Sequence, residues 1–68
     1  MESTYKVIEL IGTSPDSWEK AAKNAVETAS KTLKDLRIAE AFDFDLKMEK
    51  GKVVAYRTKV KISFKYQE

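Results

Sequence analysis

The stretch Gly12–Ala25, with the sequence GTSPDSWEKAAKNA, joins a turn to the start of a helix. Ser14 followed by Pro15 predicts this start, because a serine hydroxyl can accept a hydrogen bond from a free backbone N–H and proline fits the first helical position. From Trp18 onward, apolar residues recur every three or four positions, as on one face of an α-helix of roughly 30 Å. The members of this stripe are Trp18, Ala22, Ala25, Ala29, Leu33 and Leu36. We therefore expect one long helix, with Trp18 as a core residue rather than a ligand platform.

Predicted strands flank this helix on both sides. The segment before it, TYKVIELIG (residues 4–12), is rich in β-branched and other apolar residues. After it, RIAEAFDFDLKME (residues 37–49) and KVVAYRTKVKISFKYQE (residues 52–68) alternate between apolar and charged residues, which is typical of strands with one buried face. The order predicts the α+β class: a β-α-β-β unit whose three-stranded antiparallel sheet wraps around one long helix.

Gly51 separates the last two predicted strands and indicates a β-hairpin. Matching their apolar faces requires paired residue numbers with an even sum, which a three-residue loop between Glu49 and Val53 satisfies. This register places Asp45 opposite Arg57, so that opposite charges face each other. The other pairs that it predicts are Asp43–Lys59, Leu46–Tyr56, Phe42–Val60 and Ile38–Phe64.

The chain has 68 residues, the size of one small domain, and we assign residues 1–68 to a single domain. A chain this short buries only about 60% of the surface that its unfolded form exposes, so its core needs further support. It has no cysteine and no histidine, which excludes disulfides and removes the commonest catalytic base. We therefore expect a non-catalytic protein that is stabilised by oligomerisation through apolar strand residues left uncovered by the helix. The candidates are Phe42, Phe44, Phe64, Tyr66 and the apolar residues of the first strand.

Acidic and basic residues are mixed along the chain, with thirteen Lys and Arg, eleven Asp and Glu, and a net charge of +2. This balance does not indicate a nucleic-acid partner. The basic row of the last strand is interpreted as a solvated face, because the aromatic residues of that strand point to its other side. No apolar run approaches the roughly 20 residues of a membrane span, and the N-terminal residues lack a signal-peptide pattern. We therefore expect a cytoplasmic protein without a membrane partner.

Three carboxylates, those of Asp43, Asp45 and Glu49, share one face of a predicted strand. Clustered carboxylates can hold a hard cation such as calcium, especially where symmetry brings several copies together. The spacing does not match an EF-hand loop, and the basic residues Lys47, Arg57 and Lys59 can neutralise these groups. Calcium binding at Asp43, Asp45 and Glu49 is therefore the alternative interpretation, beside simple cross-strand ion pairing.

Three segments of the chain resemble the dodecin family: YKVIELIGTSPDSWEKAAKNAVETASKTL (residues 5–33), LRIAE (residues 36–40) and GKVVAYRTKVKISFKY (residues 51–66). The most specific matches within them are GTSPDSWEKA and YRTKVKISF. The resemblance implies a small cytoplasmic protein that assembles as a hollow homododecamer. It also implies that this assembly stores flavin, as stacked pairs at two-fold interfaces, and catalyses no reaction.

The resemblance further implies which residues lie near a bound FMN, FAD or riboflavin. The tryptophan that stacks on the flavin in typical dodecins corresponds to Ile38, and a glutamine that bonds the isoalloxazine ring corresponds to Arg57. An acidic position near the ribityl chain corresponds to Asp43, and Arg37 precedes Ile38. Because Ile38 has no aromatic face, we expect flavin binding to be weak. The alternative is a cage-like structural or calcium-binding assembly with a degenerate flavin site, in which Arg57 only pairs with Asp45.

Overall fold

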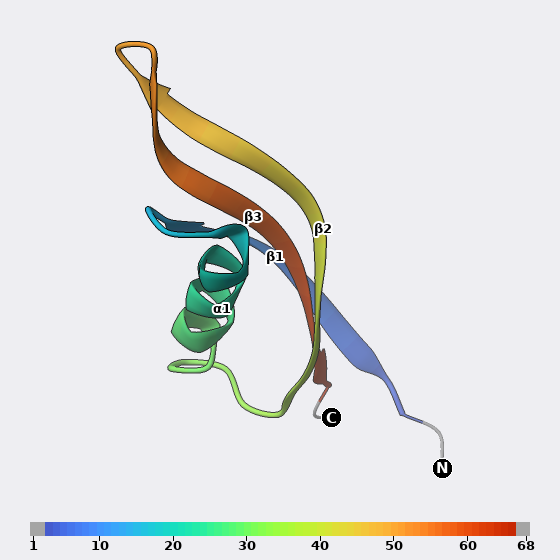
Figure 1. The fold of residues 1–68 in the computed structure, drawn as a ribbon. Coiled ribbons are helices and arrows are strands. Elements are labelled where there is room, and N and C mark those ends of the chain that lie inside the picture. Colours follow the sequence, from blue (N-terminus) through green and yellow to red (C-terminus); the bar gives the residue numbers. More distant parts are fainter. Residues whose placement is uncertain (1–2, 67–68) are drawn as a thin grey trace.

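A computed structural model describes residues 3–66 and shows a curved sheet wrapped around one helix (Figure 1). The elements follow the order β1 (Tyr5–Ser14), α1 (Trp18–Ala29), β2 (Leu36–Glu49) and β3 (Lys52–Lys65). All strand pairs are antiparallel, and β3 lies between β1 and β2. The predicted β-α-β-β topology is thus confirmed. The end of the β2–β3 hairpin projects well beyond α1 and β1 (Figure 1).

The helix begins later than the sequence predicts. Ser17 is the N-cap, and its hydroxyl accepts a hydrogen bond from the backbone N–H of Lys20 at 3.0 Å. Ser14 is the last residue of β1, and its hydroxyl accepts from the N–H of Asp16 at 3.0 Å. Each serine therefore satisfies one backbone donor: Ser14 satisfies one in the turn, and Ser17 satisfies one in the first turn of the helix. Pro15 lies in the connection rather than in the first helical position.

The helix is also shorter than expected. It has 12 residues and ends at Ala29, which corresponds to about 18 Å. The next N–H groups, those of Lys31 and Thr32, bond to carbonyls three residues back, and this tightens the chain into a turn. Leu33 and Leu36 therefore do not continue a helical stripe. They reach the same core from the connection and from β2.

The core lies between α1 and the side of the sheet that faces it. Ala21, Ala25 and Ala29 are buried on the helix, and Val60 and Ile62 are buried on β3. The alanine-rich helix face is as predicted, except that Ala21 rather than Ala22 is fully buried. Small side chains let the helix approach the sheet closely, so that β3 becomes the best-covered strand.

The hairpin register is confirmed in its middle part, where Asp45 pairs with Arg57 and Asp43 with Lys59. Leu46 also pairs with Tyr56 as predicted. The predicted three-residue loop is wrong, because Glu49 pairs with Lys52 and leaves a two-residue turn. Both turn residues have positive φ, 51° at Lys50 and 76° at Gly51, as the tight turn that suits twisted strands requires.

A bulge at Phe42 changes the register of the rest of β2. Ala41 pairs with Val60 and Asp43 with Lys59, so Phe42 has no partner of its own and the predicted Phe42–Val60 pair is wrong. Beyond the bulge, Ile38 pairs with Ser63 instead of the predicted Phe64. Because the extra residue reverses the alternation, Ile38 moves to the side of the sheet that faces away from α1. We call this side the outer face.

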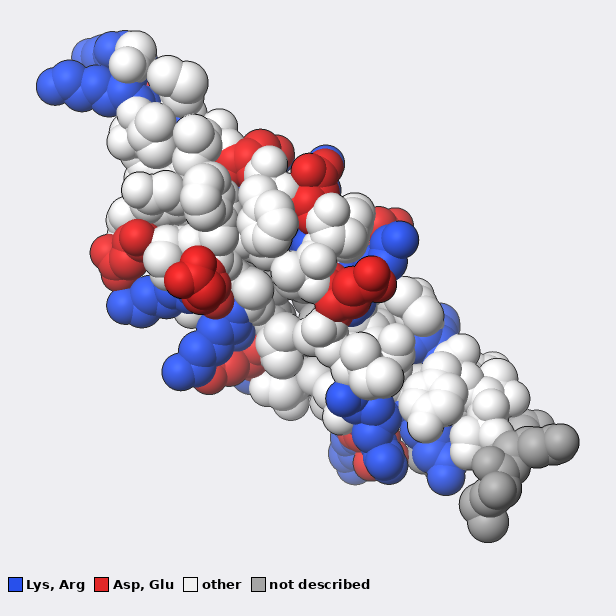
Figure 2. Space-filling model, turned by 45° about the vertical axis from the view of Figure 1, so that its right-hand side comes forward, with Lys and Arg blue, Asp and Glu red and all other residues white. Residues whose placement is uncertain are grey.

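Many large apolar residues remain exposed, as expected because one helix cannot cover all three strands. The side chains with the largest exposure include Val7, Ile11, Ile38, Phe44, Met48 and Tyr66. Figure 2 shows uncharged side chains forming a long band over one side of the molecule, with charged groups scattered along it. The described part of the chain contains no helix with the length and apolarity that a membrane crossing requires.

Candidate ligand-binding site

Two strands build a ladder of opposite charges on the outer face. Register places three acidic residues of β2 opposite three basic residues of β3: Asp45–Arg57, Asp43–Lys59 and Glu40–Lys61. Residues directly opposite each other in an antiparallel pair share a face, so these side chains all leave the sheet on the same side. This ladder holds two of the residues that the resemblance implies for ligand binding, Asp43 and Arg57.

The strongest pair of the ladder joins Asp45 and Arg57. Arg57 donates from Nε to Oδ1 of Asp45 at 2.6 Å and from Nη2 to Oδ2 at 2.9 Å, which is a two-pronged geometry. The hydrogen bond from Arg57 lowers the pKa of Asp45, with a further contribution from its positive charge. The same contact raises the pKa of Arg57. Within one chain, Arg57 is therefore the ion-pair partner of Asp45, as the register predicted.

The other two predicted metal ligands are not grouped with Asp45. Asp43 lies 3.7 Å from Nζ of Lys59, one of its oxygens accepts from the N–H of Phe44, and its side chain is 60% exposed. Glu49 lies at the hairpin end, 3.9 Å from Lys47. Within residues 3–66, no three Asp or Glu side chains stand close enough to hold one metal ion. A calcium site built from Asp43, Asp45 and Glu49 would thus need side chains from more than one copy.

Arg37 and Ile38 lie at the other end of β2. Ile38 is 64% exposed, and Arg37 is the extra residue of a second irregularity, with its guanidinium 4.0 Å from the carboxylate of Asp35. Ile38 pairs with Ser63, six positions along β3 from Arg57, which corresponds to roughly 20 Å. One chain therefore does not bring Ile38 and Arg57 together, and a ligand that touches both must lie between subunits.

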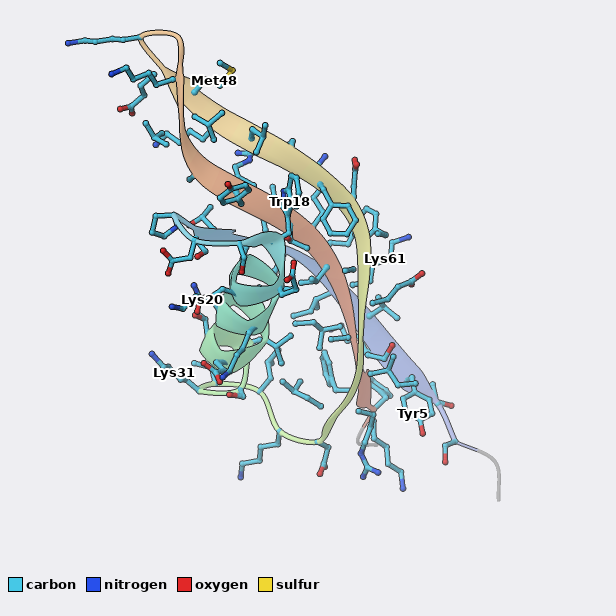
Figure 3. All side chains as sticks on the ribbon, in the orientation of Figure 1. Tyr5, Trp18, Lys20, Lys31, Met48 and Lys61 are labelled. Atoms are coloured by element: carbon cyan, nitrogen blue, oxygen red, sulfur yellow. The ribbon has the colours of Figure 1, made fainter. Side chains whose placement is uncertain are left out.

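Trp18 lies at the start of α1, against the helix-facing side of the hairpin (Figure 3). Its ring meets Phe44 and Tyr56 edge to face, with centroid distances of 5.9 and 5.1 Å. Its indole N–H donates to the backbone carbonyl of Asp45 at 3.3 Å, and its own carbonyl accepts from the buried hydroxyl of Thr58. Trp18 thus packs as a structural residue, but it is still 37% exposed and does not belong to the buried core that was predicted.

Phe42 is a residue of the outer face that the sequence reasoning placed on the opposite side. Its ring lies under the ammonium group of Lys61, 4.6 Å from the ring centre, and borders a shallow pocket of about 260 Å³. The alternating pattern could not reveal the bulge, because Phe42 continues the apolar series of Phe44 and Leu46. The small residues Ala39 and Ala41 were the available signal, since their positions now face the core.

Comparison with known proteins gives consistent matches along the chain. A family model described as Dodecin matches residues 4–67. The calcium dodecin of Mycobacterium tuberculosis is 44% identical over 63 residues, which cover 93% of this chain and 89% of that protein. The structure of dodecin from Streptomyces coelicolor has a TM-score of 0.90 at 38% identity, with 97% and 94% of the two chains covered. A structure of the M. tuberculosis calcium dodecin, described as calcium-chelating with a novel calcium-binding site, has a TM-score of 0.85 at 45% identity, with 96% and 93% covered.

Proposed function

The chain belongs to the dodecin family, and from this premise we propose that it is a non-catalytic small-ligand-binding protein that works as a homododecamer. Residues 1–68 form its single domain in this proposal, and its location is cytoplasmic. The absence of histidine and cysteine from the sequence supports a binding role over catalysis.

Exposed apolar surface supports the proposed assembly. Val7 on β1, Phe44 and Met48 on β2 and Val53 on β3 are each about half exposed or more in one chain. These residues lie on both faces and at both ends of the sheet, and burying them between copies supplies the stability that so small a core lacks. Twelve copies are proposed from the family alone.

Flavin is the first candidate ligand, and we propose that it binds weakly. Ile38 is exposed where a stacking tryptophan is expected, so it offers apolar area but no aromatic face. The loss of two symmetry-related stacks, at about 0.5–1.5 kcal/mol each, lowers affinity roughly ten- to a hundredfold. Arg57, at the position expected to bond the flavin ring, is already bound to Asp45. Storage of flavin by this chain therefore requires much higher flavin concentrations than storage by a dodecin with the stacking tryptophan.

Calcium is the second candidate, and we favour it over flavin. The relative with 44% identity is a calcium dodecin, and a structure of the protein of that name is described as having a calcium-binding site. Asp43 is well exposed and its contact with Lys59 is long, so this carboxylate can accept a cation with little competition. Because one chain gathers no three carboxylates among residues 3–66, copies must share the ion. The observation that carries this preference is the exposed Ile38 in place of an aromatic residue.

Parallel calorimetric titrations of the purified assembly with CaCl₂ and with riboflavin test the proposal. We expect saturable calcium binding with a non-integral number of ions per chain, and riboflavin binding that is too weak to saturate at micromolar concentrations. Tight riboflavin binding with no calcium binding would reverse the preference. Binding of neither ligand by an intact twelve-chain particle would leave a structural cage as the function.

A further inference from the structure

Arg57 is the cation of the outer face with the largest capacity to bind an anion, because its planar guanidinium carries five N–H donors in a fixed fork. Lys59 follows it on the same face of β3, roughly 7 Å further along the strand. Both side chains are more than a third exposed, so solvent and small solutes can reach them. These two residues have the chemistry and spacing to hold a phosphate group.

Asp45 occupies this fork. Its two oxygens take the Nε and Nη2 donors of Arg57, and its charge compensates that of the guanidinium. Asp43 compensates the charge of Lys59 much less, because the distance between Nζ of Lys59 and Oδ2 of Asp43 is 3.7 Å. An incoming anion therefore has to displace Asp45 before it can use the two-pronged Nε–Nη2 edge of Arg57, and at the remaining donors it meets a guanidinium whose charge is already compensated.

The position of Asp45 is held from behind the sheet as well. Its backbone carbonyl accepts the indole N–H of Trp18, which is itself fixed against Phe44 and Tyr56 on the helix-facing side. This bond belongs to the main chain, so it survives replacement of the Asp45 side chain. Because the Asp45 backbone is already held in place, less conformational entropy is lost when its carboxylate pairs with Arg57.

We propose that Asp45 sets the ligand selectivity of the outer face by excluding anionic, phosphate-bearing ligands from Arg57 and Lys59. The inference rests on the proposed ligand-binding function, and it specifies which ligands this face rejects. Neutral molecules do not require the positive charge of Arg57, so its neutralisation affects them less, and a cation competes with Arg57 for the Asp45 carboxylate rather than for the fork. Phosphate-bearing ligands need it, and they meet a neutral ion pair instead of an open cation.

The test replaces Asp45 by Asn, which keeps the size of the side chain and removes its charge. Inorganic pyrophosphate is the probe, titrated at pH 7 and constant ionic strength while the Nε–Hε NMR signal of Arg57 is followed. We expect weak but measurable pyrophosphate binding in the unmodified protein and about tenfold tighter binding in Asp45→Asn, as befits a recovered charge-assisted bond. Light scattering and circular dichroism establish that each variant assembles and folds. If Asp45→Asn does not fold, Asp45→Ser makes the same test.

Asp43→Asn is the matched control, because it removes the same charge from the neighbouring rung of the ladder. We expect it to change pyrophosphate affinity less than threefold, since its contact with Lys59 is long. The double variant Asp45→Asn/Arg57→Gln should return to the unmodified level. Equal gains in Asp43→Asn and Asp45→Asn would attribute the effect to net charge and overturn the proposal, as would no gain in Asp45→Asn. Because the probe is neither calcium nor flavin, either result is independent of whether those ligands bind.

Discussion

Gly12 of β1 lies directly against the backbone carbonyl of Ala21 in α1. A Cβ atom on Gly12 would overlap with that carbonyl oxygen and would stand 2.9 Å from the Cβ of Ala25. The absence of a side chain at this single strand position therefore lets the helix reach β3, where Ala25 packs into the same cluster as Val60 and Ile62. The approach of helix and sheet is decided by backbone contact, which cannot relax as a flexible side chain can.

Gly12→Ala should destabilise the protein by about 3 kcal/mol, because the helix has to shift away from the sheet and loosen the core. Urea denaturation followed by circular dichroism measures this. Gly51→Ala is the control: nothing lies within 4 Å of its added Cβ, so only the positive φ opposes it, at about 1 kcal/mol. Equal effects of the two substitutions would contradict the close contact.

Trp18→Ala should lower stability by about 3 kcal/mol, the lower end of the range for large aromatic side chains, since Trp18 is partly exposed. The loss comprises the edge contacts with Phe44 and Tyr56 and the hydrogen bond to Asp45. Trp18→Phe keeps a ring and should cost less than half as much. An unchanged denaturation midpoint in Trp18→Ala, together with lost ligand binding, would instead identify Trp18 as a ligand contact.

The strand register was predictable where charge and apolar pattern agree. Opposite charges at Asp45 and Arg57, together with matching apolar faces, select one register in the middle of the hairpin. The bulge at Phe42 was harder to predict, because Phe42 fits the alternating apolar pattern, and only the small residues Ala39 and Ala41 indicated that the alternation shifts beyond it. The helix end was missed for a related reason: Leu33 and Leu36 keep helical spacing but reach the core from irregular chain and from β2.

The candidate site was less predictable than the fold. Composition excluded the common catalytic residues, but the roles of Ile38 and Arg57 came from family resemblance and not from any local pattern. One chain keeps these two residues roughly 20 Å apart, so a joint role depends on contacts between copies. The spacing of apolar and polar residues along the sequence does not indicate which residues of different copies meet. The ion pair of Arg57, in contrast, was predicted from register and confirmed.

Light scattering should report a particle of twelve chains of 7.8 kDa at micromolar concentration. Met48→Asp should shift it to smaller species, because Met48 is an exposed apolar residue near the free end of the hairpin and a buried charge there is costly. Lys47→Asp is the matched control on the adjacent exposed residue, and it should leave the particle intact. Dissociation by both substitutions would point to general charge effects, and dissociation by neither would remove the hairpin end from the interface.

The Asp45–Arg57 pair should make stability depend on pH below about 4, the ordinary range of an aspartate pKa. The folded pKa of Asp45 is lowered, so its contribution is complete above the unfolded pKa and is lost as the pH falls through the folded value. The stability difference between the unmodified protein and Arg57→Gln should therefore shrink as the pH falls from 5 to 2. In the background of Asp45→Asn the same difference should stay constant. A difference that is flat in both backgrounds would contradict the pairing.

Ile38→Trp should raise riboflavin affinity by about 1–3 kcal/mol, for two stacks recovered across a two-fold axis. Fluorescence quenching of riboflavin by the new indole measures it, and Ile11→Trp on β1 is the control, since Ile11 is an exposed aliphatic residue of similar size on another strand. Tryptophan is well tolerated in strands, so both variants should assemble. A gain in Ile11→Trp equal to that in Ile38→Trp would show unspecific aromatic binding.

Adding Arg57→Gln to Ile38→Trp tests whether the assembly joins the two ends of the hairpin. Substitutions roughly 20 Å apart in one chain should act additively, because they share no partner. If Ile38 of one copy and Arg57 of another line one pocket, the gain from Arg57→Gln should instead appear only when Trp replaces Ile38, since only then does a ring lie where a neutral amide can bond its edge. Strict additivity would place the two residues in separate environments. Failure of the double variant to bind riboflavin, in an intact particle, would leave calcium as the ligand to pursue.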